Sequence, residues 1–419
     1  MANVVVVGGG FAGLSAAARL AKLRHHVTLV ESTDILGGQL RGVTRDGLVW
    51  QAHRETVTLP GVFRDLFRKS GRPLERALEL EKIVGRRHVY KDKLVLDLPS
   101  GNRGDQSEAL IDTFGFDKWS TWVDRFTPVW DSIRRVTLDR TFTGKADFEA
   151  EQWKTLHPRR SLYRVAAKEL NDYYLRKIVL DPVRLAGHHR RSTPGFVAVS
   201  NYVERNFGLW RFAGGRPALA DALTVRLEER KVDVLTRTAA HGIRFAEGKA
   251  TGVETSGGVI PADVVVWCAP NHPAPLPPSP ELRLIPASRT YLTLDPAAPD
   301  LTDEILVHAN PPIRVWTSAP GQWTVEHRSG EDPVNVMARC GLDVRPYIVN
   351  RWDQSPTQLV TQCHWGWEWQ RWTTAVRVPG VNPVGGVFFA GAHAHPGGSL
   401  EMIGMATAAI AEAVGPAPR

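Results

Sequence analysis

The fold is decided near the N-terminus, where residues 3–31 read NVVVVGGGFAGLSAAARLAKLRHHVTLVE. The β-branched run 3–7 predicts a buried parallel strand. The alanine-rich stretch 14–23 predicts a helix with apolar residues on every face. Residues 26–30 predict a second strand, which Glu31 ends. The stretch therefore predicts a strand–helix–strand unit at the start of an α/β domain.

Gly8, Gly10 and Gly13 lie between the first strand and the helix in G-x-G-x-x-G spacing. The first glycine permits the tight turn, the second lets the backbone approach a pyrophosphate, and the third lets the helix pack closely on the strand. The helix start, with Phe11 and Ala12, then points unpaired N–H groups and its positive dipole end at the phosphates. This spacing predicts a Rossmann-type dinucleotide site.

Glu31 supports that interpretation because it ends the second strand 18 residues after Gly13. A carboxylate about 20 residues after the glycines accepts hydrogen bonds from the adenosine ribose, and Ser32 follows it directly. The negative charge disfavours NADP, whose 2′-phosphate would be repelled. A glycine-rich turn without a ligand is the simpler alternative, but the strand, helix and acid around the motif argue against it.

Composition sets the broad class. The 419 residues are enough for two or three domains. The net charge is +8, with short basic clusters such as Arg86-Arg87-His88 and 188–191. No segment resembles a nucleic-acid-binding module, so we expect no nucleic-acid partner. Attraction to a phosphate-rich cofactor or to lipid head groups accounts for the charge equally well.

Three cysteines without a C-x-x-C pair argue against a disulfide framework or a cysteine-built zinc site, and indicate a reducing compartment. The first predicted strand begins at about residue 3, which leaves no room for a signal peptide. No apolar run approaches the roughly 20 residues that cross a bilayer. We therefore expect a cytoplasmic protein, with peripheral membrane contact left open.

Gly37, Gly38, Gln39 and Arg41 follow the acid after a short spacer. At this point the chain resembles the flavin amine oxidase and phytoene desaturase superfamily, in which a basic residue after two glycines approaches the FAD phosphates. The resemblance implies FAD as the cofactor. Gln39 stands where many members have arginine or lysine, and Arg41 is the candidate to replace that contact.

Two further segments, 59–67 and 212–219, resemble bacterial-type phytoene desaturases. Ala240 falls at the position where the family contacts the FAD adenine, mainly through the backbone. Within residues 385–402, GGVFFAGAHAHPGGSLEM closely resembles the last segment of these enzymes. The resemblance implies that this segment holds the ribityl-pyrophosphate and the flavin edge, through Gly391, Ala392, Gly398, Ser399, Leu400 and Glu401.

The helix that begins near Leu400 would then direct its N-terminal dipole at the N1/O2 side of the flavin. His393 and His395 alternate in the same loop, but two histidines without other ligands are weak evidence for a metal, and we expect none. His395 is the single candidate for an acid or base beside the flavin. Glu401 is a candidate to cap the helix or contact the flavin, and no other catalytic residue is identified.

The predicted architecture is an α/β fold with a Rossmann-type FAD-binding domain built from discontinuous segments and an inserted α+β substrate domain. The FAD-binding domain takes residues 1–75, 206–285 and 376–419. The substrate domain takes residues 76–205 and 286–375. Helical spacing is evident in 121–136 and 161–178, and a proline-rich linker runs from 270 to 280. Five tryptophans lie between Trp352 and Trp372, either as an aromatic wall for substrate or as core packing.

These observations predict an FAD-dependent oxidoreductase that takes a hydride from a C–H bond of a hydrophobic, isoprenoid-like small molecule. A flavin amine oxidase is the first alternative. An FAD-binding scaffold or a flavin-dependent isomerase without net redox turnover is the second. The substrate, the electron acceptor and the oligomeric state, including a homodimer, stay open.

Overall fold

The computed structural model describes residues 1–137, 142–276, 284–301, 304–362, 371–375, 380–394 and 398–418. Its first sheet has six strands in the order β19-β20-β13-β1-β2-β9. All neighbours are parallel except β19 and β20. The bounds are β1 Asn3–Val7, β2 His26–Val30, β9 Asp233–Leu235, β13 Val264–Trp267, β19 Gly380–Val384 and β20 Val387–Phe389. Strands from three separated parts of the chain therefore form one sheet, as predicted.

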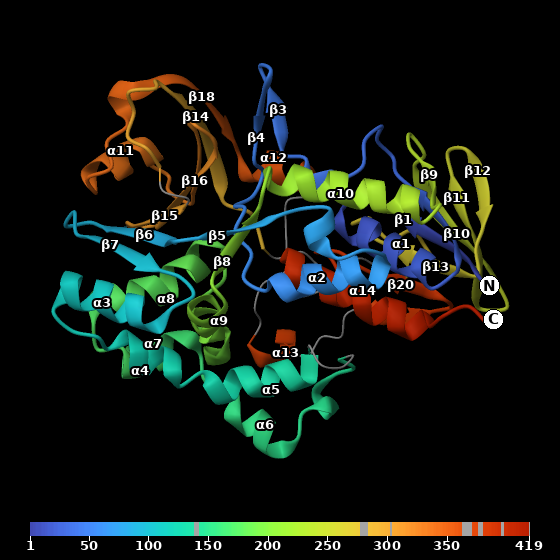
Figure 1. Cartoon of the computed structure of the whole chain (residues 1–419), viewed down its shortest axis with the longest axis horizontal. Helices are drawn as coiled ribbons and strands as arrows, with labels where there is room; N and C mark the ends of the chain where they lie inside the picture. Colours follow the sequence, from blue (N-terminus) through green and yellow to red (C-terminus); the bar gives the residue numbers. More distant parts are fainter. Residues whose placement is uncertain are drawn as a thin grey trace.

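Side-chain alternation along β1 explains the two layers that cover this sheet. Val4 and Val6 pack in the cluster formed with the helices, whereas Val5 and Val7 pack in the cluster formed with a small antiparallel sheet. The helices on the first face are α1 Phe11–Lys22, α2 Pro60–Ser70, α10 Gly215–Glu229 and α14 Leu400–Val414. The small sheet contains β10 Ala240–Ala246, β11 Lys249–Thr255 and β12 Gly258–Pro261 (Figure 1).

A second large sheet has seven strands in the order β18-β14-β17-β16-β15-β6-β7. It also joins distant segments, because β6 pairs in parallel with β15. One face packs on α11 Pro333–Arg339. The bounds are β6 Gly85–Tyr90, β7 Val95–Pro99, β14 Ser288–Leu294, β15 Glu304–His308, β16 Ile313–Ala319, β17 Gln322–His327 and β18 Ile348–Gln354.

The other face of this sheet meets a helical layer, drawn below it in Figure 1. The two stretches with helical spacing, 121–136 and 161–178, are helical, and each contains parts of two helices. Asp172 explains the second break, since its side chain accepts from the Leu175 N–H and starts a new helix. The layer consists of α3 Arg103–Phe114, α4 Trp119–Asp124, α5 Thr127–Thr137, α6 Ala150–Thr155, α7 Leu162–Glu169, α8 Tyr173–Leu185 and α9 Val199–Phe207.

The remaining elements connect these layers. The hairpin of β3 Val43–Arg45 and β4 Leu48–Trp50 projects beside the larger sheet (Figure 1). A short ladder pairs β5 Leu80–Ile83 with β8 Leu209–Phe212. The small helices are α12 Pro356–Thr361 and α13 Trp372–Ala375. The two termini lie close together, where the Arg24 guanidinium donates to the Ala417 carbonyl at 3.0 Å.

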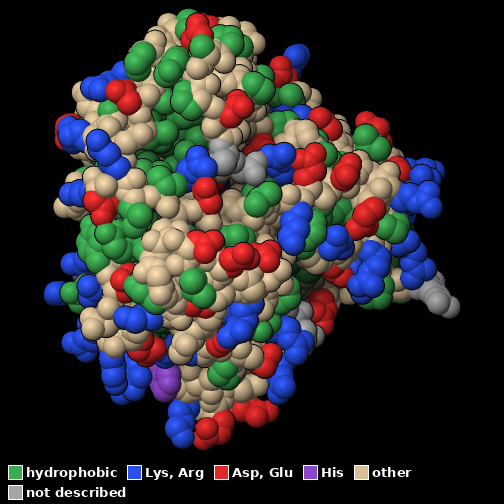
Figure 2. All heavy atoms as spheres, turned by 60° about the vertical axis from the view of Figure 1, so that its left-hand side comes forward, with side chains coloured by type: hydrophobic (Ala, Val, Ile, Leu, Met, Phe, Trp, Pro, Cys, Tyr) green, Lys and Arg blue, Asp and Glu red, His purple; other side chains and the backbone are tan. Residues whose placement is uncertain are grey.

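The surface charge is mixed. Figure 2 shows Lys and Arg interspersed with Asp and Glu over the face it presents. Within the described ranges, no helix is both long enough and apolar enough to cross a membrane.

Candidate functional site

The glycine loop after β1 leaves no room for a side chain at Gly13 and is open at Gly10. A Cβ on Gly13 would lie 1.8 Å from the Gly8 carbonyl oxygen, so only glycine lets α1 approach the strand this closely. Gly10 is the N-cap of α1 and brings no capping side chain to its first N–H groups. A Cβ built on Gly10 meets no described atom within 4 Å, because its backbone faces open space.

The second glycine pair packs directly on this loop. The Gly37 N–H donates to the Gly9 carbonyl at 2.8 Å, and a Cβ on Gly38 would lie 3.2 Å from the Gly10 Cα. Gly9 was missed in the sequence analysis because it stands between the motif glycines. A Cβ there would lie 2.6 Å from a Leu36 methyl and 3.1 Å from the Glu31 carboxylate.

The Glu31 carboxylate is fixed in position at the end of β2. Its Oε2 accepts from the Gly9 N–H at 2.6 Å. Its Oε1 accepts from the Thr33 N–H at 2.8 Å and the Thr33 hydroxyl at 2.9 Å. The acid is therefore oriented beside the glycine loop before any ligand binds.

A cavity of about 2030 Å³ joins the N-terminal and C-terminal glycine loops. Gly13 does not line it, in keeping with its packing role. Most of the predicted binding residues do line it: Gly8, Gly10, Phe11, Ala12, Glu31, Ser32, Gly37, Gly38, Gln39, Ala240, Gly391, Ala392, Gly398, Ser399, Leu400 and Glu401.

Arg41 does not line the cavity, and its Nε donates to the Leu36 carbonyl at 2.6 Å. Its terminal nitrogen pairs with Asp221 of α10 at 2.5 Å. The guanidinium therefore links the Gly37–Gly38 loop to α10, and its contact with the FAD phosphates stays a prediction. Gln39 does line the cavity, and its Oε1 lies 3.0 Å from the His53 Nε2.

The C-terminal loop leads into α14, whose start also lines the cavity. Ser399 caps this helix, since its hydroxyl accepts from the Met402 N–H at 3.3 Å. Glu401 is buried, and its Oε1 accepts from the Thr58 N–H at 2.8 Å, so it anchors another cavity-lining segment. Burial lowers the pKa of His393 to about 3, which keeps its imidazole neutral. His395 lies outside the described residues.

The other part of the cavity is apolar and comes from the helical layer. Trp130 and Ile133 project from α5, and Ile178 and Leu185 from α8. The remaining apolar lining there includes Leu98, Trp119, Phe142, Phe148, Trp153, Leu156, Phe196, Val197, Val203 and Phe207. We call this set, with Trp130, Ile133, Ile178 and Leu185, the apolar wall.

The tryptophans of the predicted aromatic wall are partly described. Trp352 stacks on Tyr291 with ring centroids 3.8 Å apart and does not line the cavity. Trp372 packs edge-on against Trp153 at 5.5 Å. Trp365, Trp367 and Trp369 lie outside the described residues. Trp352 therefore serves core packing, and Trp372 supports the apolar wall from behind.

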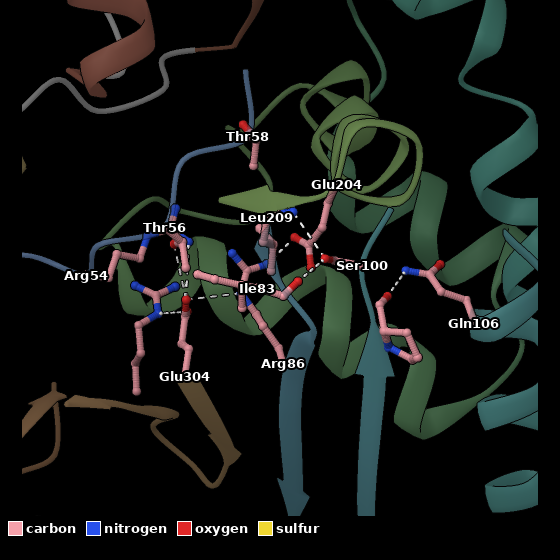
Figure 3. Close-up of polar contacts among 12 residues, drawn as sticks. Arg54, Thr56, Thr58, Ile83, Arg86, Ser100, Gln106, Glu204, Leu209 and Glu304 are labelled. Carbon is pink, nitrogen blue, oxygen red and sulfur yellow. Dashed lines mark hydrogen bonds and ion pairs between the residues drawn. The ribbon is translucent and has the colours of Figure 1, made fainter. Parts of the chain in front are cut away.

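A buried ionic cluster lines the cavity between the glycine loops and the apolar wall (Figure 3). Glu304, at 2% exposure, lies at its centre. One carboxylate oxygen is 3.1 Å from the Arg86 Nε, and the other is 3.0 Å from the Arg314 Nε. Arg86 also pairs with Glu204 of α9. Arg54 lies farther off, 3.8 Å from Glu304.

This cluster keeps Glu304 ionised. Burial alone would raise the pKa of its carboxyl, but the Arg86, Arg54 and Arg314 guanidiniums outweigh that effect and hold the pKa well below its usual range. Sequence analysis missed Glu304 because nothing local marks it. The one available signal was the basic cluster at 86–88, since strand alternation turns Arg86 and His88 to the cavity while Arg87 pairs with Asp97.

Comparison with known proteins agrees with this geometry. The family described as FAD dependent oxidoreductase matches residues 3–397. A 4,4′-diapolycopene oxygenase of Methylomonas sp is 26% identical over 275 residues, which cover 63% of this chain and 55% of that protein. A 4,4′-diaponeurosporene oxygenase of Staphylococcus aureus (strain bovine RF122 / ET3-1) is 24% identical over 276 residues, with the same shares covered. The chain thus spans about half the length of these curated relatives.

A solved putrescine oxidase structure aligns with a TM-score of 0.62 at 16% identity, covering 99% of this chain and 98% of that one. This likeness shows that the two proteins share a fold. The family match covers nearly the whole chain, including the N-terminal glycine loop and the C-terminal loop as far as residue 397. The chain therefore belongs to the family of FAD-dependent oxidoreductases.

Proposed function

We propose that this FAD-dependent oxidoreductase removes a hydride from a C–H bond of a hydrophobic, isoprenoid-like molecule. The observation that carries the proposal is the continuous cavity, which has glycine loops and a fixed acid at one end and the apolar wall at the other. FAD supplies the two-electron acceptor when bound. The chain supplies the binding groups, the orientation of the substrate and the exclusion of water.

The residues fit an FAD with its adenosine end at Glu31. We propose that the Glu31 carboxylate and Ser32 take the ribose, and that the backbone of Ala240 meets the adenine. The pyrophosphate then lies over the open face of Gly10, at the N–H groups of Phe11 and Ala12 and beside Gly38. Gly391, Ala392 and residues 398–401 take the flavin end, where the positive end of α14 favours negative charge.

We propose the same division of labour for the domains. Residues 1–75, 206–285 and 376–419 would bind the cofactor, and residues 76–205 and 286–375 would hold the substrate. The six-stranded sheet and the apolar wall support this division, since the first uses strands of the cofactor segments and the second mostly uses helices of 76–205.

The substrate class is inferred from the wall and the relatives together. Aliphatic and aromatic side chains dominate the lining from α5, α6 and α8, so burial of a long apolar molecule would be favourable. The curated relatives are named as oxygenases of 4,4′-diapolycopene and 4,4′-diaponeurosporene. An apolar isoprenoid therefore fits both lines of evidence better than a small amine does.

Purified protein is expected to be yellow and to release FAD, not FMN or NAD, when denatured. The proposed ribose contact of Glu31 requires an adenosine, which FMN lacks, and the proposed role of the C-terminal glycine loop requires a flavin, which NAD lacks. Mass spectrometry of the released ligand checks this. Anaerobic addition of diaponeurosporene, which keeps one saturated CH2–CH2 unit, should then bleach the visible flavin absorption band. Bleaching by putrescine instead would establish the amine oxidase alternative, and bleaching by neither compound would contradict the proposed substrate class.

Glu31→Ala is expected to weaken FAD binding about tenfold to a hundredfold. The ribose hydrogen bonds it removes are charge-assisted and contribute roughly 1.5–3 kcal/mol. Titration of the apoprotein with FAD measures the change. Asp34→Ala is the matched control, since this neighbouring exposed acid does not line the cavity. Equal affinities for the two variants would show that Glu31 does not hold the ribose.

A further inference from the structure

Three buried polar side chains are linked by hydrogen bonds in a row that ends at the cavity. Asp181 of α8 lies with its Oδ2 3.0 Å from the His308 Nδ1. The His308 Nε2 lies 3.0 Å from the Nδ1 of His88, which lines the cavity. Asp181 is 1% exposed, His308 0% and His88 3%. The two rings lie within 5° of parallel.

Two strands and a helix create this arrangement. His88 on β6 pairs in register with Leu306 on β15, and Tyr90 pairs with His308. The two histidines therefore point to the same face of the sheet, toward α8. Tyr90 stacks on the His308 ring with centroids 4.5 Å apart, which holds that ring in place.

The hydrogen bonds determine which ring nitrogen of each histidine carries a hydrogen. Asp181 is ionised, because its bonds and charges with His308, Lys177 and Arg184 outweigh burial and lower its pKa. An ionised carboxylate accepts only, so the His308 Nδ1 must carry a hydrogen. The Nε2 of His308 therefore carries no hydrogen and accepts a hydrogen bond from the His88 Nδ1–H. This leaves the Nε2 of His88, the one of the three residues that lines the cavity, with a bare lone pair.

The surroundings keep both rings neutral in the resting protein. Burial is the main cause that lowers the pKa of His88, followed by the neighbouring His308 and Arg86, while Glu304 opposes them. Burial likewise lowers the pKa of His308 against the effect of Asp181, and Lys177 adds to the lowering. The charged groups that face the two histidines and Asp181 from β6, β15 and α8 are therefore Arg86, Glu304, Lys177 and Arg184.

We propose that His88 is the catalytic base of the oxidation. His308 and Asp181 are positioning residues that fix the tautomer of His88 and stabilise the positive charge that the accepted proton brings. We call these three residues the relay. The proposal deepens the function proposed above and rests on it. It uses groups that the glycine motifs and the flavin loop do not involve.

The proton and electron balance is complete. One substrate C–H bond breaks and its electron pair leaves with the hydrogen as hydride to the oxidised flavin. The adjacent C–H bond then loses its proton to the His88 Nε2, and its electron pair becomes the new C=C bond. The substrate loses two electrons and two hydrogens. His88 can pass its Nδ1 proton to His308, whose positive charge then lies against the Asp181 carboxylate.

A weak base is sufficient for this step. A C–H bond next to a carbon that is losing hydride is strongly acidic, so a neutral imidazole with a lowered pKa can accept its proton. The same lowered pKa keeps the base unprotonated well into the acidic range. Glu304 and Arg86 of the ionic cluster lie on the same two strands as the histidines. Among these charged residues, His88 is a neutral proton acceptor that lines the cavity.

The proton assignment is tested first, without substrate. Long-range ¹H–¹⁵N spectra of the FAD-loaded protein with labelled histidine should show His88 and His308 as Nδ1–H tautomers. His88→Asn and His308→Asn assign the signals. Asp181→Asn should weaken the preference of His308, since an amide can donate to its Nδ1. A hydrogen on the His88 Nε2 in the wild-type protein would overturn the proposal.

The kinetic test follows flavin reduction by diaponeurosporene, which keeps one saturated CH2–CH2 unit, under anaerobic conditions. His88→Asn should slow the rate constant about 10²- to 10⁴-fold, the range for a lost general base, with unchanged affinity for FAD and for diaponeurosporene. Asp181→Asn, which does not line the cavity, should slow it at least about tenfold. In the wild-type protein the rate constant should fall as acid protonates the relay, and His88→Asn should abolish that acid limb.

His327→Asn is the matched control, because His327 is a buried histidine of the same sheet that does not line the cavity. Its rate constant should match that of the wild-type protein. Rates for His88→Asn and Asp181→Asn equal to that of the control would refute the relay while leaving the proposed function intact. If diaponeurosporene does not reduce the wild-type flavin, the substrate proposal fails, and the tautomers of His88 and His308 alone decide the relay.

Discussion

Gly13→Ala is expected to lower the free energy of unfolding by about 3 kcal/mol, at the upper end of the usual cost of overpacking, and to prevent FAD retention. The added methyl group would lie 1.8 Å from the Gly8 carbonyl oxygen, and the atom it meets belongs to the backbone. Relief therefore requires that α1 move away from β1. That movement would shift the helix start away from the glycine loop, so stability and cofactor binding should fall together.

Thermal unfolding and the FAD content after purification measure this effect. Gly61→Ala is a matched control, since Gly61 also lies near the start of a helix and a Cβ there would meet no described atom within 4 Å. That variant should be unchanged or more stable by up to about 1 kcal/mol, because alanine is the better helix former. Equal melting temperatures for the two variants would argue against close packing at Gly13.

Glu304→Gln is expected to cost about 3–5 kcal/mol of folding free energy, the typical cost of removing one partner from a buried ion pair. The glutamine leaves Arg86 and Arg314 buried beside a neutral side chain. The buried guanidiniums would then lose their shared counter-charge. Chemical denaturation of the FAD-free protein isolates this effect from any change in cofactor binding.

The contribution of Glu304 to the free energy of unfolding should depend on pH in a definite direction. The pKa of Glu304 is lowered in the folded protein, so its contribution is fully present above the unfolded value near 4.5 and is lost as the pH falls through the folded value. The stability difference between the wild-type protein and Glu304→Gln should therefore shrink on acidification. Glu331→Gln, which breaks an exposed pair with Arg339, should change stability little at any pH. A constant difference at all pH values would mean that Glu304 is not ionised.

The part of the site whose residues lie close together in the sequence was predictable from sequence. The strand at 3–7, the glycine spacing and Glu31 all lie within one supersecondary unit, in which each residue's role is set by its neighbours. The helix predicted after the C-terminal glycines is confirmed as α14. The pairing of Arg41 with Asp221 was not predictable, because the place of Arg41 after the glycines says nothing about an acid on a distant helix.

The part that depends on sheet pairing was not predictable. His88 and His308 are 220 residues apart, and they meet only because β6 pairs with β15 in one particular register. A shift of one residue would turn one of the two rings to the opposite face of the sheet, away from the other. Glu304 and Arg86 depend on the same register. Neither group carries a spacing motif, so a single sequence offers no means of bringing them together.

The order of strands in the six-stranded sheet also bears on how the protein is made. β1 lies between β2 and β13, and the Asn3 N–H donates to the Asp263 carboxylate, 260 residues away. β20 and α14 complete the sheet and the cavity from the other end of the chain. Such non-local contacts slow folding. During synthesis, the nascent N-terminal unit must therefore wait for most of the chain before its apolar strand edges are covered, which makes this interval the period of greatest exposure to aggregation and greatest need for chaperones.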